Sequence, residues 1–308
     1  MSHPAQALSV VVCAYTEERW EDLLACVSSL IQQQDPVGEI VVVIDHNPTL
    51  LFACRRQWPD LRVVPNLGAK GLSGARNTGW RVCRGPLIAF IDDDACADPA
   101  WSRELAGAYS EDVLGVGGYI DPIWPDGRPP SWWPCTFNWV VGCSYTGMPR
   151  QRSRVRNAIG ANMSVRKHVL ENVEGFATSL GRVGKVPLGA EETAMYLKAG
   201  TLHQGMSVLY EPAARVHHRV TPERVTIDYF VKRCFGEGRS KARMARMNLA
   251  PQSQALHTER TYVVRTLPIA VVQGLFSADP RRGLAVILGL LCTAAGYVQE
   301  LVTNTTSV

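Results

Sequence analysis

The N-terminal part of the chain alternates short apolar runs with longer segments in which apolar residues recur every three or four positions. Short apolar runs bounded by turn residues are typical of buried strands, and the longer period is typical of helices with one buried face. The pattern predicts strands at Leu8–Cys13, Glu39–Ile44, Leu61–Val64 and Leu87–Ile91. Helices are predicted near residues 20–31, 50–58 and 72–83. Strands that alternate with helices favour an α/β fold with a largely parallel, Rossmann-like sheet.

The regularity fades after Val113. Gly160–Val173 and Ala190–Ala199 have the pattern of connecting helical segments, and Val208–Val216 has that of a strand. The segment Ile123–Trp139 is rich in proline and tryptophan, a composition that suits a loop wall. Trp132, Trp133 and Trp139 in this segment are candidates to line a pocket for a sugar or aromatic acceptor.

The C-terminal tail has a different composition from the rest of the chain. Thr266–Ala278 and Gly283–Gln299 are uncharged and largely apolar, and the second is close to the minimum length of a membrane span. A hairpin at a membrane surface, a buried helical pair and a true span all fit this pattern. We therefore expect a main domain over residues 1–245, with halves near 1–118 and 119–245. An apolar helical region over 246–308 would follow it as a candidate membrane contact.

The overall composition is that of a globular protein, with 46% hydrophobic and 19% charged residues. The net charge of +4 is too small to indicate a nucleic-acid partner. Nine scattered cysteines without a C-x-x-C pair fit reduced thiols in a cytoplasmic protein better than a disulfide scaffold. The first eight residues also lack the basic start and apolar core of a signal peptide.

The most informative motif is the run of three aspartates, Asp92 to Asp94, directly after an apolar strand. Adjacent carboxylates repel one another, so a buried run of them needs a compensating positive charge. Residues two apart in an extended segment face the same way, so Asp92 and Asp94 can converge on one cation while Asp93 points elsewhere. Mg²⁺ and similar ions prefer such oxygen ligands. A solvated acidic turn before a helix starting at Asp98-Pro99 fits these residues equally well.

Four other groups are candidates for chemistry, and each has a plain structural alternative. Asp45 follows a predicted strand, where ligands of parallel sheets bind, or it is only a turn residue. The glycine-rich segment 68–77 opens a helix whose start favours anions, or it is a flexible turn. Glu191 and Glu192 stand where a general base or a helix-dipole partner is expected. Further along the chain, His217 and His218 are candidate metal ligands, or only a surface histidine pair. Arg233, Arg239 and Lys241 are candidate partners of a diphosphate, or part of a solvated basic helix.

Taken in this order, the motifs resemble those of family 2 glycosyltransferases, which have a GT-A nucleotide-sugar fold. The resemblance covers roughly residues 8–245 and rests on Ser9–Tyr15, Asp45, Gly71-Leu72-Ser73-Gly74-Ala75-Arg76-Asn77, Phe90–Asp94, Glu191-Glu192-Thr193 and His217-His218. Within the family the chain is most similar to the polyprenyl- or dolichyl-phosphate-linked glucuronosyltransferase group and its actinobacterial relatives. That narrower likeness rests on Val140–Cys143, Arg156–Ser164 and Arg233–Lys241.

The resemblance implies an inverting, metal-dependent transfer from a nucleoside-diphosphate sugar, with UDP as the expected nucleotide and glucuronate or a hexose as the sugar. It implies Asp92, Asp94 and His218 as the site of Mn²⁺ or Mg²⁺, and Glu192 or Glu191 as the base. Nucleotide-sugar contacts are implied for Ala14, Tyr15, Glu17, Asp45, Gly71, Arg76, Asp92, Asp93, Arg233 and Arg239. Glutamate at 192 departs from the aspartate of many relatives, which leaves the choice of base open.

We expect the acceptor hydroxyl on a lipid-linked sugar or glycan at the cytoplasmic face of the membrane. A soluble small-molecule acceptor is the first alternative, and a silent nucleotide-sugar binding protein is the second. The aspartates alone do not fix the stereochemistry, because a retaining transferase can use the same metal site.

Overall fold

The computed structural model describes residues 4–179, 191–247, 260 and 262–303. The chain divides into two compact units, which we describe separately. The first unit holds Met1–Asp121, Pro149–Gly184 and Glu191–His218. The second holds Pro122–Met148 and Arg219–Val308, so the boundary predicted at residue 245 lies inside it.

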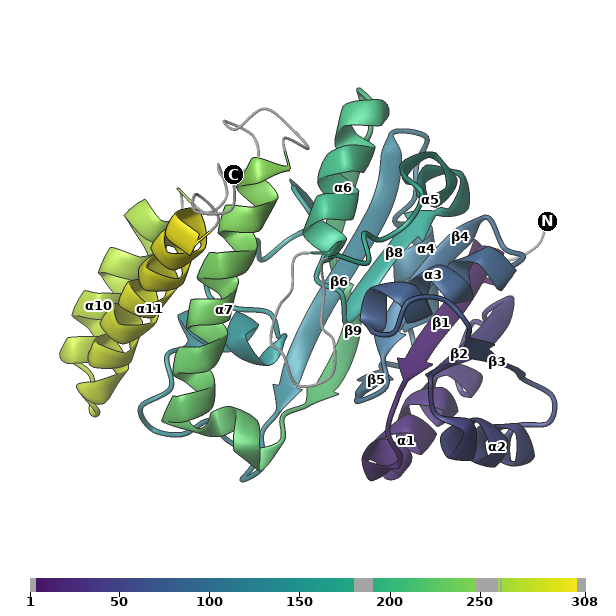
Figure 1. The fold of residues 1–308 in the computed structure, drawn as a ribbon, viewed down its shortest axis with the longest axis horizontal. Helices are drawn as coiled ribbons and strands as arrows, with labels where there is room; N and C mark the ends of the chain where they lie inside the picture. Colours follow the sequence, from purple (N-terminus) through teal and green to yellow (C-terminus); the bar gives the residue numbers. More distant parts are fainter. Residues whose placement is uncertain (1–3, 180–190, 248–259, 261, 304–308) are drawn as a thin grey trace. The chain divides into compact units, whose positions relative to one another are not determined.

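In the described part of the chain, nine strands form one sheet, most of it in the first unit (Figure 1). The strands are β1 Leu8–Ala14, β2 Glu39–Asp45, β3 Arg62–Asn66, β4 Leu87–Asp92, β5 Ala95–Ala97, β6 Val113–Ile123, β7 Ser153–Val155, β8 Asn162–Arg166 and β9 Ser207–Arg219. They run in the order β3-β2-β1-β4-β8-β6-β9-β5, with β7 paired to β9. The helices of this unit are η1 Pro4–Ala7, η2 Glu17–Arg19, α1 Trp20–Ile31, α2 Pro48–Gln57, α3 Leu72–Val82, α4 Trp101–Gly107, α5 Lys167–Val173 and α6 Glu191–Leu202.

The four N-terminal strands are parallel to one another, as the sequence predicts. Their apolar side chains join those of the helices in one buried core, which includes Val11, Val43 and Phe90. Because parallel strands share their direction, the ends of β1, β2 and β4 lie at one edge of the sheet, where Cys13 pairs with Asp92. The other strands join in antiparallel pairs, β8 between β4 and β6, and β5 beside β9.

Four strands of this sheet were not predicted: the short strands β5 and β7, and the strands β6 and β8. Val113–Ile123 forms β6, and Gly160–Val173, expected to be helical, contains β8 before the short helix α5. β6 carries glycines that weaken strand propensity, yet a Cβ at Gly118 would lie 1.8 Å from the carbonyl oxygen of Ala214. Both segments are therefore strands because neighbouring strands approach them closely, and a local sequence pattern does not reveal such an approach.

The helix after the aspartates also begins later than Asp98-Pro99 suggests. Helix α4 starts at Trp101, and Asp98 accepts a backbone hydrogen bond from Trp101. The side chain of Asp98 instead contacts His217 at 2.7 Å.

The second unit is helical in its described part and contains η3 Cys135–Val141, η4 Pro222–Val225, α7 Ile227–Arg246, the π-helical turn η5 Tyr262–Thr266, α10 Leu267–Leu275 and α11 Arg281–Thr303. The two apolar tail helices predicted from the sequence are therefore present. Helices α7 and α11 pack closely through glycines: a Cβ at Gly238 would lie 1.9 Å from the carbonyl oxygen of Thr293. By length and composition alone, α11 is the one described helix that qualifies as a candidate membrane span.

A buried carboxylate also joins α7 to α11. The side chain of Glu300 is 2% exposed and accepts hydrogen bonds from Arg239 at 2.8 Å and Arg243 at 2.7 Å. The hydrogen bonds from Arg243 and Arg239 lower the pKa of Glu300 to about 2, although burial opposes the shift. Helix α11 is therefore held to its own unit by packing and by charge.

Candidate active site

Asp92, Asp94 and His218 converge at the carboxyl edge of the sheet. Each offers one ligand atom, and these atoms all lie within 4.8 Å of one another. Asp94 Oδ1 lies 3.1 Å from His218 Nε2, and both side chains are almost fully buried. The side chain of Asp92 is 30% exposed. A pair of carboxylates and one imidazole, partly open to solvent, is a donor set that fits a divalent cation.

The strand pairing explains why these distant residues meet. Strand β4 ends at Asp92, and Asp94 immediately precedes β5. Strand β5 is antiparallel to β9, with Ala95 opposite His218 and Cys96 opposite His217. Since side chains alternate along a strand, the two neighbouring histidines face opposite ways, and only His218 belongs to the cluster. His217 contacts Asp98 instead.

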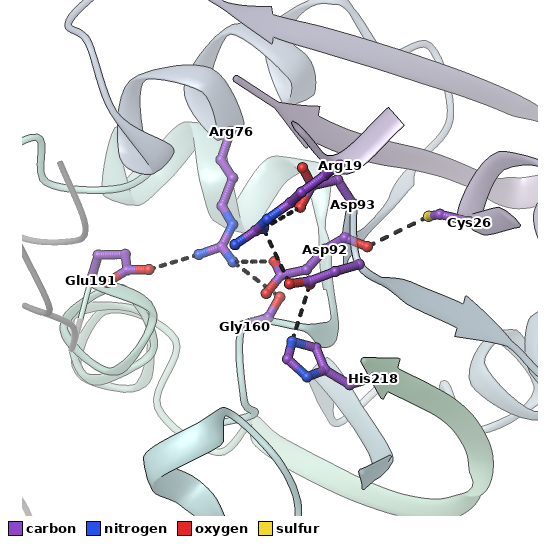
Figure 2. Close-up of polar contacts among 9 residues, drawn as sticks. Arg19, Cys26, Arg76, Asp92, Asp93, Gly160, Glu191 and His218 are labelled. Carbon is purple, nitrogen blue, oxygen red and sulfur yellow. Dashed lines mark hydrogen bonds and ion pairs between the residues drawn. The ribbon is translucent and has the colours of Figure 1, made fainter. Parts of the chain in front are cut away.

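Asp93 points away from this cluster and meets Arg19, a residue that sequence reasoning missed (Figure 2). One guanidinium nitrogen of Arg19 lies 2.9 Å from Asp93 Oδ1 and 3.1 Å from Asp94 Oδ2. Burial raises the pKa of Asp93 to about 7; the charge of Asp94 adds to the rise and Arg19 opposes it. Arg19 thus supplies the compensating charge that the aspartate run needs, and its guanidinium lies over the ring of Tyr15.

Asp45 lies at the end of β2 and holds the glycine-rich turn. It accepts hydrogen bonds from the side chain of Asn66 at 2.6 Å and from the backbone nitrogen of Gly71 at 2.9 Å. Gly71 has φ 114°, a left-handed conformation that favours glycine, and it caps α3. The turn is therefore built on Asp45, whose predicted contact with the nucleoside stays a prediction.

The segment after β1 carries three further predicted nucleotide-sugar residues. Ala14 is buried at the end of β1, whereas the side chain of Tyr15 is exposed. Glu17 accepts a hydrogen bond at 2.9 Å from Asn47, which also donates to the carbonyl oxygen of Tyr15. This hydrogen bond lowers the pKa of Glu17. The three residues follow Cys13, which pairs with Asp92 in the sheet, and their roles stay predictions.

Arg76 is buried, with a side chain only 3% exposed, and is fully engaged by the protein (Figure 2). Its Nη1 lies 2.8 Å from Glu191 Oε1, and its Nη2 contacts Asp92 Oδ1 at 3.3 Å and the carbonyl oxygen of Gly160 at 3.1 Å. The predicted nucleotide contact of Arg76 was based on its place in the motif. In the structure the residue links the aspartate cluster to the start of α6, and its nucleotide contact stays a prediction.

Glu191 and Glu192 begin helix α6, and they differ in their surroundings. Glu191 is buried and paired with Arg76, whereas Glu192 is half-buried. The charge of Glu192 acts on both Arg76 and Tyr196. The two carboxylates are therefore not equivalent.

The remaining predicted residues belong to the second unit. Arg233 contacts Glu237 at 3.2 Å and lies over the ring of Trp139, and Arg239 binds Glu300. Trp132 and Trp133 both pack against Phe230, and Trp133 is 1% exposed. Their predicted contacts with donor and acceptor stay predictions.

Comparison with known proteins identifies the chain. Residues 9–174, more than half of the sequence, match the model of glycosyl transferase family 2. The chain belongs to glycosyl transferase family 2. This family 2 enzyme is 32% identical to the glucosyl-dolichyl phosphate glucuronosyltransferase of Haloferax volcanii, over 96% of each chain. The resemblance derived from the ordered motifs is thereby confirmed.

Solved structures confirm the GT-A fold of this family 2 enzyme. A mannosyltransferase of Pyrobaculum calidifontis, in complex with GDP-mannose and Mn²⁺, superimposes with a TM-score of 0.62 at 16% identity. The match covers 98% of this chain and 90% of that one. GalNAc-T7 with UDP, GalNAc and Mn²⁺ matches with a TM-score of 0.54 at 16% identity, over 82% of this chain and 53% of that one.

Proposed function

We propose that this enzyme transfers a sugar, with inversion, from a UDP-linked donor to a hydroxyl group of a lipid-linked acceptor. The observation that carries the proposal is the convergence of Asp92, Asp94 and His218 at the carboxyl edge of the sheet, in a family 2 glycosyltransferase. Glucuronate or a hexose is the sugar we expect. The full-length likeness to a dolichyl-phosphate glucuronosyltransferase supports both the sugar and the lipid-linked acceptor.

Asp92, Asp94 and His218 would hold Mn²⁺ or Mg²⁺. The buried carboxylate of Asp94 and imidazole of His218 suit such an ion, and the partial exposure of Asp92 leaves room for a donor phosphate. A bound cation would supply charge stabilisation for the departing diphosphate. The Mn²⁺ in both structural neighbours is consistent with this choice.

Glu192 is the residue that we propose as the general base. A base must be within reach of the acceptor proton, which favours a carboxylate that an acceptor can approach. Glu191 is buried and forms a 2.8 Å ion pair with Arg76, so its carboxylate is already engaged. Glu192, next to it and half-buried, is the better candidate.

Asp45, Gly71, Tyr15 and Glu17 would surround the nucleoside, because all lie at or after the carboxyl ends of strands of the parallel half, where such sheets bind their ligands. We further propose that Arg233 and Arg239 bind the diphosphate. The tryptophans of residues 132–139 would line the acceptor path.

The C-terminal helices would seat the enzyme on the cytoplasmic face of a membrane. Their exposed apolar residues include Ile269, Val272, Phe276 and Leu291. Helix α11 is bound to α7 by the buried Glu300, which supports a surface hairpin over a free-standing span. An acceptor carried in the membrane would then lie close to its enzyme.

A donor screen tests the proposal. The protein is incubated with Mn²⁺, a lipid extract and UDP-glucuronate, UDP-glucose, UDP-GlcNAc or GDP-mannose, and nucleotide release and product mass are measured. We expect UDP release and a lipid product. Transfer from GDP-mannose alone would overturn the choice of nucleotide. Glycosylation of a water-soluble acceptor alone would favour a soluble substrate, which the tryptophan-rich segment can also accommodate.

A pair of variants tests the membrane contact without truncating the second unit. Leu291→Glu places a charge on the exposed apolar side of α11, and Phe52→Glu places one on an exposed apolar residue of α2. We expect only Leu291→Glu to reduce flotation with anionic vesicles. Equal flotation of both variants would contradict membrane contact through α11.

A further inference from the structure

Arg76 connects the parts of the first unit that the proposed reaction uses. It projects from α3, contacts Asp92 at the end of β4, and pairs with Glu191 at the first position of α6 (Figure 2). It also donates to the carbonyl oxygen of Gly160 and lies over the ring of Phe176. A Cβ at Gly160 would lie 2.6 Å from the guanidinium, so glycine is needed for this approach.

The two carboxylates do not share Arg76 equally. Glu191 contacts it at 2.8 Å with a side chain 6% exposed, whereas Asp92 contacts it at 3.3 Å with a side chain 30% exposed. Burial disfavours the charge of Arg76, but Glu191, then Asp92, then Glu192 raise its pKa above the usual value. Glu191 is thus the main counter-ion of a buried guanidinium, and Asp92 is the more weakly held partner.

This division matters because a cation held by Asp92 would compete with Arg76 for that carboxylate. A buried charge that loses one partner is strongly uncompensated, so without Glu191 the guanidinium would depend more on Asp92, the next strongest of its counter-charges. Loss of the negative charge of Glu191 would also make the surroundings of the cation site more positive by one unit. Both effects weaken the binding of a divalent cation.

We propose that Glu191 and Arg76 are positioning residues: Glu191 neutralises Arg76 so that Asp92 stays available to the cation. The same ion pair fixes the start of α6, which carries Glu192, relative to the cation site. The inference rests on the proposed function, since it takes Asp92 as a metal ligand. It gives Glu191 and Arg76 a role that requires no contact with the substrate.

The test measures Mn²⁺ affinity by calorimetry, without substrate, in wild type, Glu191→Gln, Arg76→Met and the double variant. Glu191→Gln should weaken Mn²⁺ binding by about fivefold or more, because removing one negative charge near a divalent ion costs about 1 kcal/mol even with the screening of water. Arg76→Met should bind Mn²⁺ at least as tightly as wild type. The double variant, whose charge balance is restored, should bind close to wild type. A purely structural role would weaken binding in all three.

Glu211→Gln is the matched control. Glu211 is as buried as Glu191 and pairs with Arg152, but it lies seven residues from His218 along β9, about 23 Å by the rise of a strand. The Glu211→Gln variant should have the Mn²⁺ affinity of wild type. If Arg76→Met does not fold, Glu191→Gln and the control still decide the outcome.

The outcomes separate this inference from the proposed function. If Asp94→Asn binds Mn²⁺ as tightly as wild type, the metal site itself is wrong. If Asp94→Asn abolishes binding but folded Glu191→Gln keeps the wild-type affinity, only the positioning role is overturned. Weaker binding in both Glu191→Gln and Arg76→Met, without recovery in the double variant, would also overturn it.

Discussion

One guanidinium nitrogen of Arg19 lies 2.9 Å from Asp93 and 3.1 Å from Asp94, so a single cation bridges two adjacent buried carboxylates. The bridge explains how three consecutive aspartates are tolerated at the end of a buried strand. It also implies that the stability of this edge depends on positive charge, from Arg19 or from a bound metal ion.

Replacing Arg19 should make the protein more dependent on metal. Arg19→Met leaves Asp93 and Asp94 without their shared partner, and we expect the free energy of unfolding in EDTA to fall by about 3 kcal/mol. Because a cation that binds only the folded state restores stability, the gain in Tm on adding Mn²⁺ should exceed that of wild type. Arg103→Met, at a half-exposed ion pair, is the control. Equal Mn²⁺ responses would argue against the bridge.

The two neighbouring histidines should behave differently. His218→Ala removes a buried member of the cluster, and we expect sugar transfer to fall by about a hundredfold or more, as for loss of a group that stabilises transition-state charge. His217→Ala removes a half-exposed contact with Asp98 and should change the rate little. Rates at saturating donor and Mn²⁺ measure both. A larger loss in His217→Ala would mean that the register of β9 beside β5 is misassigned.

Glu192→Gln should affect the chemical step rather than metal binding. Loss of a general base costs about a hundredfold or more in kcat. The glutamine keeps the size of the side chain, so Mn²⁺ affinity should remain near that of wild type, in contrast to Glu191→Gln. Unchanged kcat in Glu192→Gln would remove it from the role of base.

Acid should weaken the contact between α7 and α11. Since the pKa of Glu300 is lowered from 4.5 to about 2, its stabilising effect is complete above pH 4.5 and is lost as pH falls towards 2. At pH 7 we expect Glu300→Gln to cost about 2 kcal/mol, the scale of charged hydrogen bonds. Urea unfolding followed by tryptophan fluorescence should show this difference shrink between pH 4.5 and 2. A constant difference across that range would contradict the assignment.

The sequence was most informative where local pattern and tertiary structure agree. Val10–Val12 and Val41–Val43 are uninterrupted apolar runs, buried in the parallel half of the sheet, and their strands were predicted correctly. Strand β6 was missed because Gly115, Gly117 and Gly118 lower its propensity. These glycines are needed for contacts with residues far along the chain.

The same limit applies to the site. Alternation along a strand separated Asp93 from Asp92 and Asp94, because that rule is local. The pairing of Arg76 with Glu191 joins residues 115 positions apart, and that of Arg19 with Asp93 joins residues 74 apart. No period or motif encodes such pairs. A buried arginine needs carboxylate partners, but which carboxylates these are is known only from the fold.

The most direct test of the central claim is Mn²⁺ binding by calorimetry, together with UDP release, in wild type, Asp94→Asn and Asp112→Asn. Asp94 belongs to the buried cluster, whereas Asp112 is an exposed carboxylate of the same unit. We predict that wild type and Asp112→Asn bind Mn²⁺, and that both release UDP only when Mn²⁺ is present. Asp94→Asn should lose both properties while remaining folded. Metal-dependent UDP release by folded Asp94→Asn at the wild-type rate would contradict the account.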